Sequence, residues 1–449
     1  MNTFMRCVVA CAVSAACTTG FAIDLVESHA RAIGTDPSLA AADQALLAGR
    51  EKAVQGKALL RPQVALSAGV SYVDQRSSSA DLPPALSDLV KSQSAGTMVQ
   101  AALQATQPLY DAKASSDKRQ MQQQTVLAEI KHRDAEQDLI QRVGEAYFNV
   151  LLAQEALRVT QAEKTAVTMQ RDRAQARFDV GRGKVTDLQE AQARYDAVLT
   201  REVSAQSTLA LRRAQYRELT GAPADGLAAL AAGFVPMPPA PDDLSSWQAR
   251  AEDQNTRVQF KRGEVAIARA EIDKYKLSGR PTLDMVASYT YKGQNGGLSQ
   301  SITPDSSRAA TIGVQLTVPL YTGGAIDSRQ RESVAKKGQA EQELVAAQRD
   351  ARLQVQDAFL AVKTGVSRVG TLEQSVRSAQ TALEATTLAR DVGTRTELDV
   401  LDAQQRLFTA QLDLAQARND YLLGRIKLAS AAGVLQEGDL HALNAYLVR

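Results

Sequence analysis

Four short segments of the chain alternate apolar and polar residues with a period of two. The first has apolar residues at Val64, Leu66, Ala68, Val70 and Tyr72. The same alternation recurs over residues 99–106, 282–291 and 311–318. A period of two places the apolar side chains on one face of a strand and the polar side chains on the other. The pattern therefore predicts four strands of about 10 residues each.

Two much longer segments have a helical pattern. Residues 112–179 contain no proline and one glycine, and residues 325–391 contain no proline and three glycines. At about 1.5 Å per residue, each segment would span roughly 100 Å. Farther along, apolar residues recur at intervals of seven, at Leu401, Phe408, Ala415 and Leu422. This spacing is typical of a coiled-coil seam, so we expect long helices that pack closely side by side.

The chain contains a tandem duplication. Residues 180–192 return in similar form as residues 392–404, with Val180 and Val392 separated by 212 positions. Both copies lie at a break between two helical segments, so each is a helix-to-helix tip. Each half of the chain follows the same order of strand, polar loop, strand, long helix, tip and helix. The polar loops, residues 76–96 and 293–309, are expected to lie in solvent on one side of a membrane.

These patterns divide the chain into five predicted segments. They are an export signal (1–22), a first repeat (23–221), a crossover linker (222–244), a second repeat (245–433) and a C-terminal tail (434–449). The linker is rich in alanine, proline and glycine, which is typical of a connecting belt rather than a folded domain. We expect both the linker and the tail to lie at the equator of the helical part.

The first 22 residues have the features of a secretory signal. A positive start that ends at Arg6 precedes an apolar stretch over residues 8–16, and Gly20 and Ala22 supply small residues before a cleavage site. The apolar stretch is too short to be a membrane anchor. Lipoprotein processing at Cys17 is an alternative, although Ser14 stands where a large aliphatic residue is usual.

The cysteine content supports export. All three cysteines, Cys7, Cys11 and Cys17, lie in the predicted signal. After cleavage the chain would have no thiol, and therefore no disulfide and no cysteine metal site. After residue 22, no run approaches 18 apolar residues, so no transmembrane helix is expected.

The four strands could lie in either of two environments. They could form a soluble sheet packed on a helix, or they could cross a membrane with the polar face toward a water-filled lumen. In lipid, four strands cannot remain open, because each unpaired backbone group there costs several kcal/mol. Several copies must then share one barrel. Two copies would give eight strands and a filled interior, whereas three copies would give twelve strands and a channel.

Charge and composition exclude several function classes. The formal net charge is +2 and no strong basic block is present, so nucleic acid is not an expected partner. The three histidines, His29, His132 and His441, are scattered without metal spacing. We found no Walker loop and no nucleophile elbow. We therefore predict no catalytic residue, no cofactor, no metal site and no enzymatic activity.

Two acids mark the second tip. Asp399 and Asp402 are three positions apart at the start of a helix, so they share one face. They could simply be solvated acids that interact favourably with the helix dipole. In a threefold assembly, however, they would form two stacked rings of carboxylates, which favour cations and raise one another's proton affinity.

The second tip carries a basic residue, and the first tip carries polar residues at a similar place. Arg395 could make a charge-assisted link to Asp187 or Thr186 and hold the tips together. Alternatively, these are unrelated exposed charges, worth less than about 1 kcal/mol.

Several phrases of the sequence resemble one known family. They are residues 392–396, 398–403, 429–433 and 439–444, and the segments around Pro108 and Pro319. Together they resemble the TolC-like outer-membrane efflux and type I secretion channels, the outer membrane factor family. The resemblance covers nearly the whole chain after the signal.

The resemblance implies a fold and a function. The fold would be that of a mixed α/β membrane protein, a trimeric 12-stranded β-barrel with four strands per chain, continuous with a long periplasmic α-helical coiled-coil barrel. The protein would be an exit duct in the outer membrane of a Gram-negative bacterium. Its partners would be two further copies, outer-membrane lipid, a periplasmic adaptor and an inner-membrane ABC or proton-driven pump. A second hypothesis is an envelope-spanning coiled-coil tether without an open lumen.

The resemblance also implies roles for tip residues. Asp399 and Asp402 would form the periplasmic constriction, and Arg395 would bridge to Thr186 and Asp187 to keep the tunnel shut. Adaptor docking would use the tips, at Gly181, Arg182, Gly393 and Thr394.

The sequence departs from the family pattern at two places. Arg390 stands where the family has a tyrosine of the gate, so we include Arg390 among the latch residues. Arg182 and Gly183 stand where an aliphatic residue usually follows the first tip glycine, which bears on the choice of adaptor.

Overall fold

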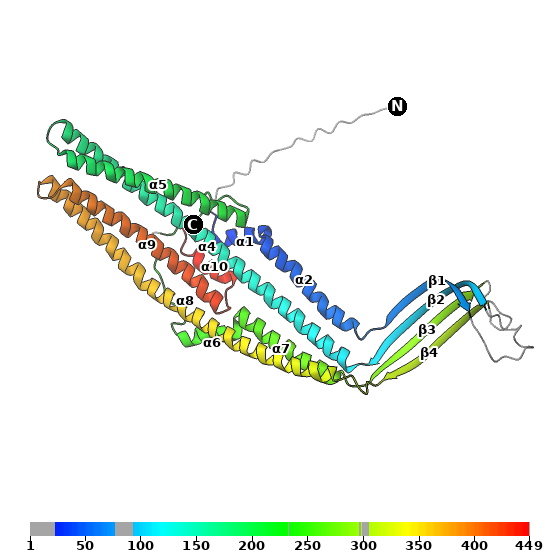
Figure 1. Ribbon diagram of the computed structural model, residues 1–449. Coiled ribbons are helices and arrows are strands. Elements are labelled where there is room, and N and C mark those ends of the chain that lie inside the picture. The colour runs from blue at the N-terminus through cyan, green and yellow to red at the C-terminus, as the bar shows by residue number, and fades with distance from the viewer. Residues whose placement is uncertain (1–22, 77–92, 232, 296–297, 299–304, 449) are drawn as a thin grey trace, which may run out of the picture. The chain divides into compact units, whose positions relative to one another are not determined.

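The computed structural model describes residues 23–76, 93–231, 233–295, 298 and 305–448 (Figure 1). The predicted export signal, with Cys7, Cys11 and Cys17, lies outside this part, as do most residues of the two strand-connecting loops. The described elements begin with α1 (Leu25–Thr35), α2 (Pro37–Ala58), β1 (Gln63–Arg76), β2 (Gln93–Tyr110), α4 (Ala112–Asp179) and α5 (Val185–Thr220). They continue with α6 (Leu244–Gln254), α7 (Thr256–Leu277), β3 (Thr282–Gln294), β4 (Ser306–Thr317), α8 (Ala325–Asp391), α9 (Glu397–Ala431) and α10 (Glu437–Asn444).

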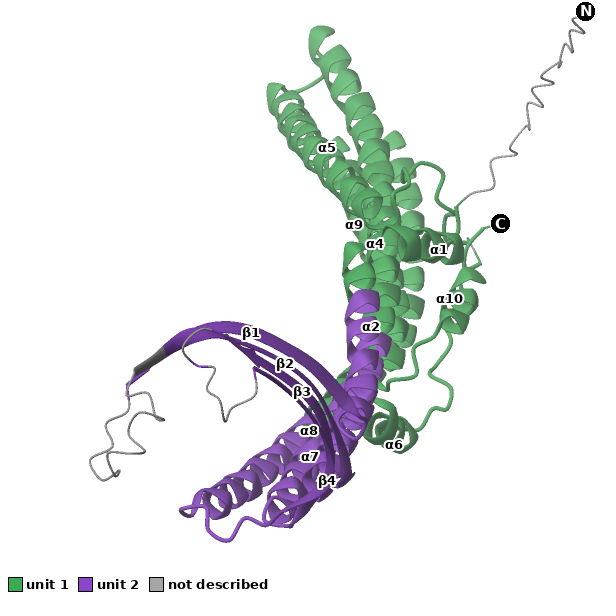
Figure 2. Cartoon of the chain, turned by 90° about the vertical axis from the view of Figure 1, so that its right-hand side faces the viewer, with its two compact units in different colours: residues 1–41, 134–255, 349–449 green, residues 42–133, 256–348 purple. Residues whose placement is uncertain are grey.

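The chain divides into two compact units, and each unit contains segments of both sequence repeats (Figure 2). Unit 1 comprises residues 1–41, 134–255 and 349–449, and unit 2 comprises residues 42–133 and 256–348. Three of the four boundaries fall inside α2, α4 and α8, so these helices contribute to both units, and the fourth lies between α6 and α7. Corresponding parts of the two repeats are therefore folded together, as expected for a duplication in which neither repeat buries its own core.

Unit 2 contains an antiparallel sheet in the order β1-β2-β3-β4. The four predicted strands are confirmed, and they are 14, 18, 13 and 12 residues long. The strands extend beyond the alternating segments, so the predicted loops, residues 76–96 and 293–309, were too long. For example, β4 begins at Ser306, inside the predicted loop 293–309, since backbone pairing continues from Tyr289↔Ala310 to Gly293↔Ser306 whatever the side chains are.

The register of the sheet aligns the apolar side chains on one face. Leu66 pairs with Leu103, and Leu103 pairs with Tyr289. The next row on the other face runs from Ala65 through Gln104 and Ser288 to Thr311. Residues directly opposite one another share a face, so the predicted alternation produces one largely apolar and one largely polar surface. Polar residues interrupt the apolar surface near the strand ends, where Arg308 pairs with Tyr291 and Gln107 pairs with Met285. In a single chain the apolar surface is exposed, with Leu66 at 74%.

Small residues bring the helices of unit 2 close together. A Cβ atom placed on Gly49 of α2 would lie 2.2 Å from the Cβ atom of Ala128 on α4. One placed on Gly263 of α7 would lie 2.3 Å from a methyl carbon of Leu127. The hydroxyl of Thr125 donates a hydrogen bond to the carbonyl oxygen of Gly49 at 3.0 Å, which the close approach permits.

Unit 1 contains two helical hairpins, formed by the end of α4 with α5 and by the end of α8 with α9 (Figure 1). The predicted tips are confirmed as the turns between Asp179 and Val185 and between Asp391 and Glu397. No helix in the described part of the chain is both long enough and apolar enough to cross a membrane.

The crossover linker is fixed to both hairpins of unit 1. The buried hydroxyl of Tyr147 on α4 donates a hydrogen bond to the carbonyl oxygen of Ala228 at 2.9 Å. The hydroxyl of Tyr421 on α9 donates to the carbonyl oxygen of Met237 at 2.8 Å. The backbone N–H of Val448 donates to the carbonyl oxygen of Ala229 at 2.8 Å. The linker and the C-terminal tail are thus hydrogen-bonded to each other, and the linker is bonded to α4 and α9, near the ends of the hairpins away from the tips.

Candidate functional site

The two tip turns have the same backbone geometry. Gly181 and Gly393 have φ angles of +70° and +84°, in the left-handed region that favours glycine. The N–H of Arg182 donates to the carbonyl oxygen of Arg177 at 2.8 Å, and the N–H of Thr394 donates to that of Ala389 at 2.9 Å. These bonds close the last turn of each long helix, so the chain reverses within a few residues. The predicted docking residues thus lie on two equivalent, exposed turns.

Asp399 has a local structural role at the second tip. It forms a capping box with Thr396, in which the N–H of Thr396 donates to the Asp399 carboxylate at 2.8 Å and the N–H of Asp399 donates to the Thr396 hydroxyl at 3.2 Å. The donors of Thr396 hold the pKa of Asp399 below its ordinary value, and the guanidinium of Arg395 adds to this effect. Asp399 is the third residue of α9, and its carboxylate therefore caps the start of the helix.

Asp402 is paired across the two hairpins. Nη2 of Arg194, on α5, lies 2.5 Å from Oδ1 of Asp402 on α9. Arg194 also donates to the side-chain oxygen of Gln405 at 3.1 Å. Sequence reasoning missed Arg194, although the duplication held a signal. Glu190 occupies the place of Asp402 in the first copy and lies 3.9 Å from the same guanidinium, so both copies direct an acid at Arg194.

A second charged cluster joins the hairpins at Glu397. Nη1 of Arg390, on α8, lies 3.3 Å from Oε2 of Glu397, and Nη1 of Arg177, on α4, lies 3.2 Å from Oε1. The side chains of Arg390 and Glu397 are only 9% and 13% exposed. Arg390 also pairs with Asp391 at 2.6 Å. Arg390 was a predicted latch residue, whereas Glu397 and Arg177 were not predicted.

Within a single chain, the structure shows no hydrogen bond or ion pair from Arg395 to Thr186 or Asp187, all of which are described residues. Instead, Nη1 of Arg395 in the tip turn lies 3.4 Å from Oδ1 of Asp399 in the first turn of α9. The hydroxyl of Thr186 donates to the carboxylate of Asp187 at 3.4 Å. All three residues are exposed or half-buried at the tips, where a second copy can reach them. The link from Arg395 to Thr186 and Asp187 stays a prediction for neighbouring copies.

The described residues contain no group of three or more histidine, cysteine or acidic side chains that could hold a metal ion. Each histidine has its own local surroundings. His29 is buried in α1, and burial lowers its pKa. Nε2 of His132 lies 2.7 Å from Oδ1 of Asp43 in unit 2. His441 lies in the last turn of α10.

Comparison with known proteins identifies the family. The family described as outer membrane efflux protein matches the chain twice, over residues 30–222 and 247–434. The chain is 32% identical to outer membrane protein TolC of Vibrio cholerae, over 100% of this chain and 99% of that protein. It is 30% identical to the alkaline protease secretion protein AprF of Pseudomonas aeruginosa, over 95% and 88% of the two chains.

Solved structures share the fold. The CmeC outer membrane channel of Campylobacter jejuni has a TM-score of 0.77 at 16% identity and covers 94% of this chain and 89% of its own. The MtrE outer membrane channel of Neisseria gonorrhoeae, in its open state, has a TM-score of 0.72 at 19% identity, over 92% and 90%. The two matched segments confirm the internal repeat, and the chain belongs to the outer membrane efflux protein family.

Proposed function

We propose that three copies of this chain assemble into a single exit duct of the outer membrane, with a twelve-stranded barrel in the membrane and a helical tunnel in the periplasm. The register of the sheet carries this proposal. It places one largely apolar surface and one largely polar surface on the four strands, which is the arrangement that a barrel between lipid and water requires.

The edges of the sheet support a shared barrel. β1 and β4 are the outer strands, and each has one side without a partner strand in a single chain. In lipid, these unpaired backbone groups would cost several kcal/mol each, so β4 of one copy must pair with β1 of the next. Three copies leave a channel, whereas the interior of an eight-stranded barrel would be filled by side chains.

The charged contacts at the tips support a closed state of the tunnel. Arg194–Asp402 and Arg177–Glu397 each join the first hairpin to the second within one copy. We propose that Arg395 adds contacts to Thr186 and Asp187 of the neighbouring copy, and that Asp399 and Asp402 of three copies form the constriction. Opening would require the hairpins to separate and these charged side chains to become solvated.

The partners and cargo follow from this role. A duct without its own energy source needs an inner-membrane pump, which would be ABC-type or proton-driven, and a periplasmic adaptor that seals the two together. We propose that the adaptor docks on the two tip turns, at Gly181, Arg182, Gly393 and Thr394. Residues 1–22 would direct export and then be removed. The duct needs no cofactor, because it performs no chemistry on its cargo.

The direct test is single-channel conductance of the purified protein in a planar bilayer. We expect a small conductance for the native chain, because the tips are closed, and a larger one with weaker cation selectivity for Asp399→Ala combined with Asp402→Ala. The absence of any conductance in both proteins would contradict the duct. That outcome would favour the second hypothesis, an envelope-spanning coiled-coil tether without an open lumen.

A further inference from the structure

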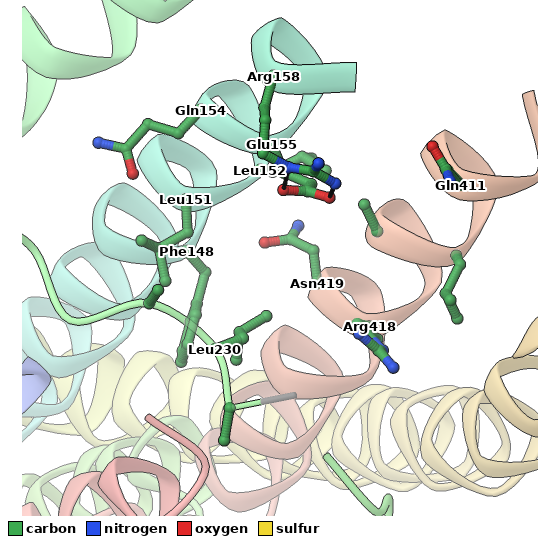
Figure 3. Close-up of a pocket in the computed structure, with 14 residues that line it drawn as sticks. Phe148, Leu151, Leu152, Gln154, Glu155, Arg158, Leu230, Gln411, Arg418 and Asn419 are labelled. Atoms are coloured by element: carbon green, nitrogen blue, oxygen red, sulfur yellow. Dashed lines mark hydrogen bonds and ion pairs between the residues drawn. The ribbon is translucent and has the colours of Figure 1, made fainter. Parts of the chain in front are cut away.

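Unit 1 contains a cavity away from the tips that the duct does not explain. It has a volume of about 480 Å³ and lies between α4, the crossover linker and α9 (Figure 3). This volume is within the range of small-molecule sites, roughly 300–1,000 Å³. The cavity is lined by residues of both hairpins, since α4 belongs to the first hairpin and α9 to the second.

The walls of the cavity are held in place by the fold. Leu230 of the linker lines the cavity, and its backbone forms a bridge with Leu447 of the C-terminal tail. The N–H of Ala231 donates to the carbonyl oxygen of Tyr446 at 2.9 Å. The hydroxyl of Tyr147 fixes the linker to α4 through Ala228. The cavity is therefore largely preformed, which lowers the cost of ordering on binding.

The lining is more apolar than polar, and its charged side chains form ion pairs. Phe148, Leu151 and Leu230 contribute apolar surface. The guanidinium of Arg158 donates two hydrogen bonds to the carboxylate of Glu155, at 2.6 and 2.8 Å. Arg418 donates to Glu373 at 2.8 Å. Because each charge has its counter-charge, the cavity favours a neutral molecule over an ion.

Two buried polar atoms of described residues in the wall lack a hydrogen-bond partner, Nε of Arg418 and Oδ1 of Asn419. The side chain of Asn419 on α9 extends into the cavity in Figure 3, and the residue is 5% exposed. Its Oδ1 atom has no hydrogen-bond partner among the described residues. A buried acceptor without a partner costs about 1–3 kcal/mol, so its position at the centre of a preformed, mainly apolar cavity indicates a place for a donor.

We infer that this cavity binds a neutral, largely apolar small molecule that carries one hydrogen-bond donor. The apolar body contacts Phe148, Leu151 and Leu230, and the donor bonds to Oδ1 of Asn419. This inference does not depend on the proposed duct. Binding is measured without conductance, so the binding test and the conductance test can fail separately. A bound molecule also bridges α4 and α9, so it stabilises the folded form against unfolding.

The test uses N-phenylnaphthylamine, a neutral fluorescent molecule with two aromatic groups and one N–H donor. The full-length protein is placed in lipid nanodiscs and titrated with this probe. Asn419→Leu removes the acceptor at similar volume, and Ala415→Trp fills the cavity from α9. Gln416→Leu is the matched control, because Gln416 is exposed on the same helix and makes its hydrogen bond to Asp420 outside the lining. Thermal unfolding checks that every variant is folded.

We expect saturable binding of one probe per chain in the native protein and in Gln416→Leu. We expect binding at least about tenfold weaker in Asn419→Leu and in Ala415→Trp. A probe signal that rises without saturation and equally in all four proteins would overturn the inference, since it reports partition into lipid. Saturable binding that survives both cavity variants would also overturn it, because the probe would then occupy another site.

Discussion

Arg194 and Asp402 form a direct ion pair between the two hairpins, with 2.5 Å between Nη2 of the arginine and Oδ1 of the acid. The arginine lies on α5 and the acid on α9, so the pair holds the first sequence copy to the second. Asp402 is also one of the two predicted constriction acids. An acid of the proposed constriction is thus bound to the first hairpin, so a movement of the hairpins that opens the proposed constriction would also break this ion pair.

Arg194→Ala is expected to favour the open duct. The side chains of Arg194 and Asp402 are 25% and 48% exposed, so we assign the pair about 1 kcal/mol at most. Its loss corresponds to roughly a fivefold change in the ratio of open to closed channels, measured in a planar bilayer. The matched control is Arg212→Ala on the same helix, where the arginine bonds to Gln215. Equal open probabilities for the two variants would contradict this role of Arg194.

Glu397→Gln is expected to loosen the tips more than Arg194→Ala does. The substitution leaves Arg177 and Arg390 facing a neutral amide, and the Arg390 side chain is only 9% exposed. A buried charge that loses its partner costs about 1–3 kcal/mol. We expect faster proteolysis at the two turns, measured on the folded protein. Glu384→Gln is the control, because Glu384 accepts a hydrogen bond from Gln380 on the exposed side of α8. Similar cleavage rates in both variants would refute the cluster's role.

Sequence reasoning located the elements that depend on local periodicity. The alternation around Leu66 and Ile312 predicted the strands, and the duplicated glycines Gly181 and Gly393 predicted the tips, because both signals lie within a few neighbouring residues. The strand ends were less well predicted, since β4 continues through polar residues near Ser306 by backbone pairing alone.

The partners of the charged residues were harder to predict. Asp399 and Arg390 were predicted as site residues, but Glu397 was not, because its contacts depend on Arg177 in another helix. The same holds for Arg194, which lies 208 positions from Asp402. A single sequence shows which residues share a helix face, but the faces that meet are decided by packing. The cavity at Asn419 likewise exists only once the linker covers α4 and α9.

Asp36 and Arg142 predict a dependence of stability on pH. Arg142 donates two hydrogen bonds to the buried Asp36, at 3.0 and 2.8 Å, and this holds the pKa of Asp36 below its ordinary value. A lowered folded pKa stabilises the fold above the unfolded value of about 3.9, and this contribution is lost as the pH falls through the folded pKa.

Asp36→Asn is therefore expected to lower the stability near pH 7 by about 2–3 kcal/mol and to flatten the acid side of the stability curve. Thermal unfolding between neutral pH and pH 3 measures both effects. Glu51→Gln on α2 serves as the control, because Glu51 is exposed on the same helix. Parallel curves for the native protein and Asp36→Asn would show that the carboxylate does not contribute.

Lysine scanning of β1 tests which face of the sheet meets lipid. Leu66 lies in the apolar row with Leu103 and Tyr289, whereas Ser67 lies on the opposite face, where its hydroxyl donates to the carbonyl oxygen of Ala102. Leu66→Lys is expected to cost about 2–4 kcal/mol in the bilayer and to reduce the amount of folded oligomer in outer membranes. Ser67→Lys should assemble normally and shift the conductance toward anions, because the new charge would line the lumen. The reverse result, with Ser67→Lys failing to assemble and Leu66→Lys tolerated, would mean that the face carrying Ser67 meets lipid. That result would contradict the proposed barrel, in which the apolar face meets lipid.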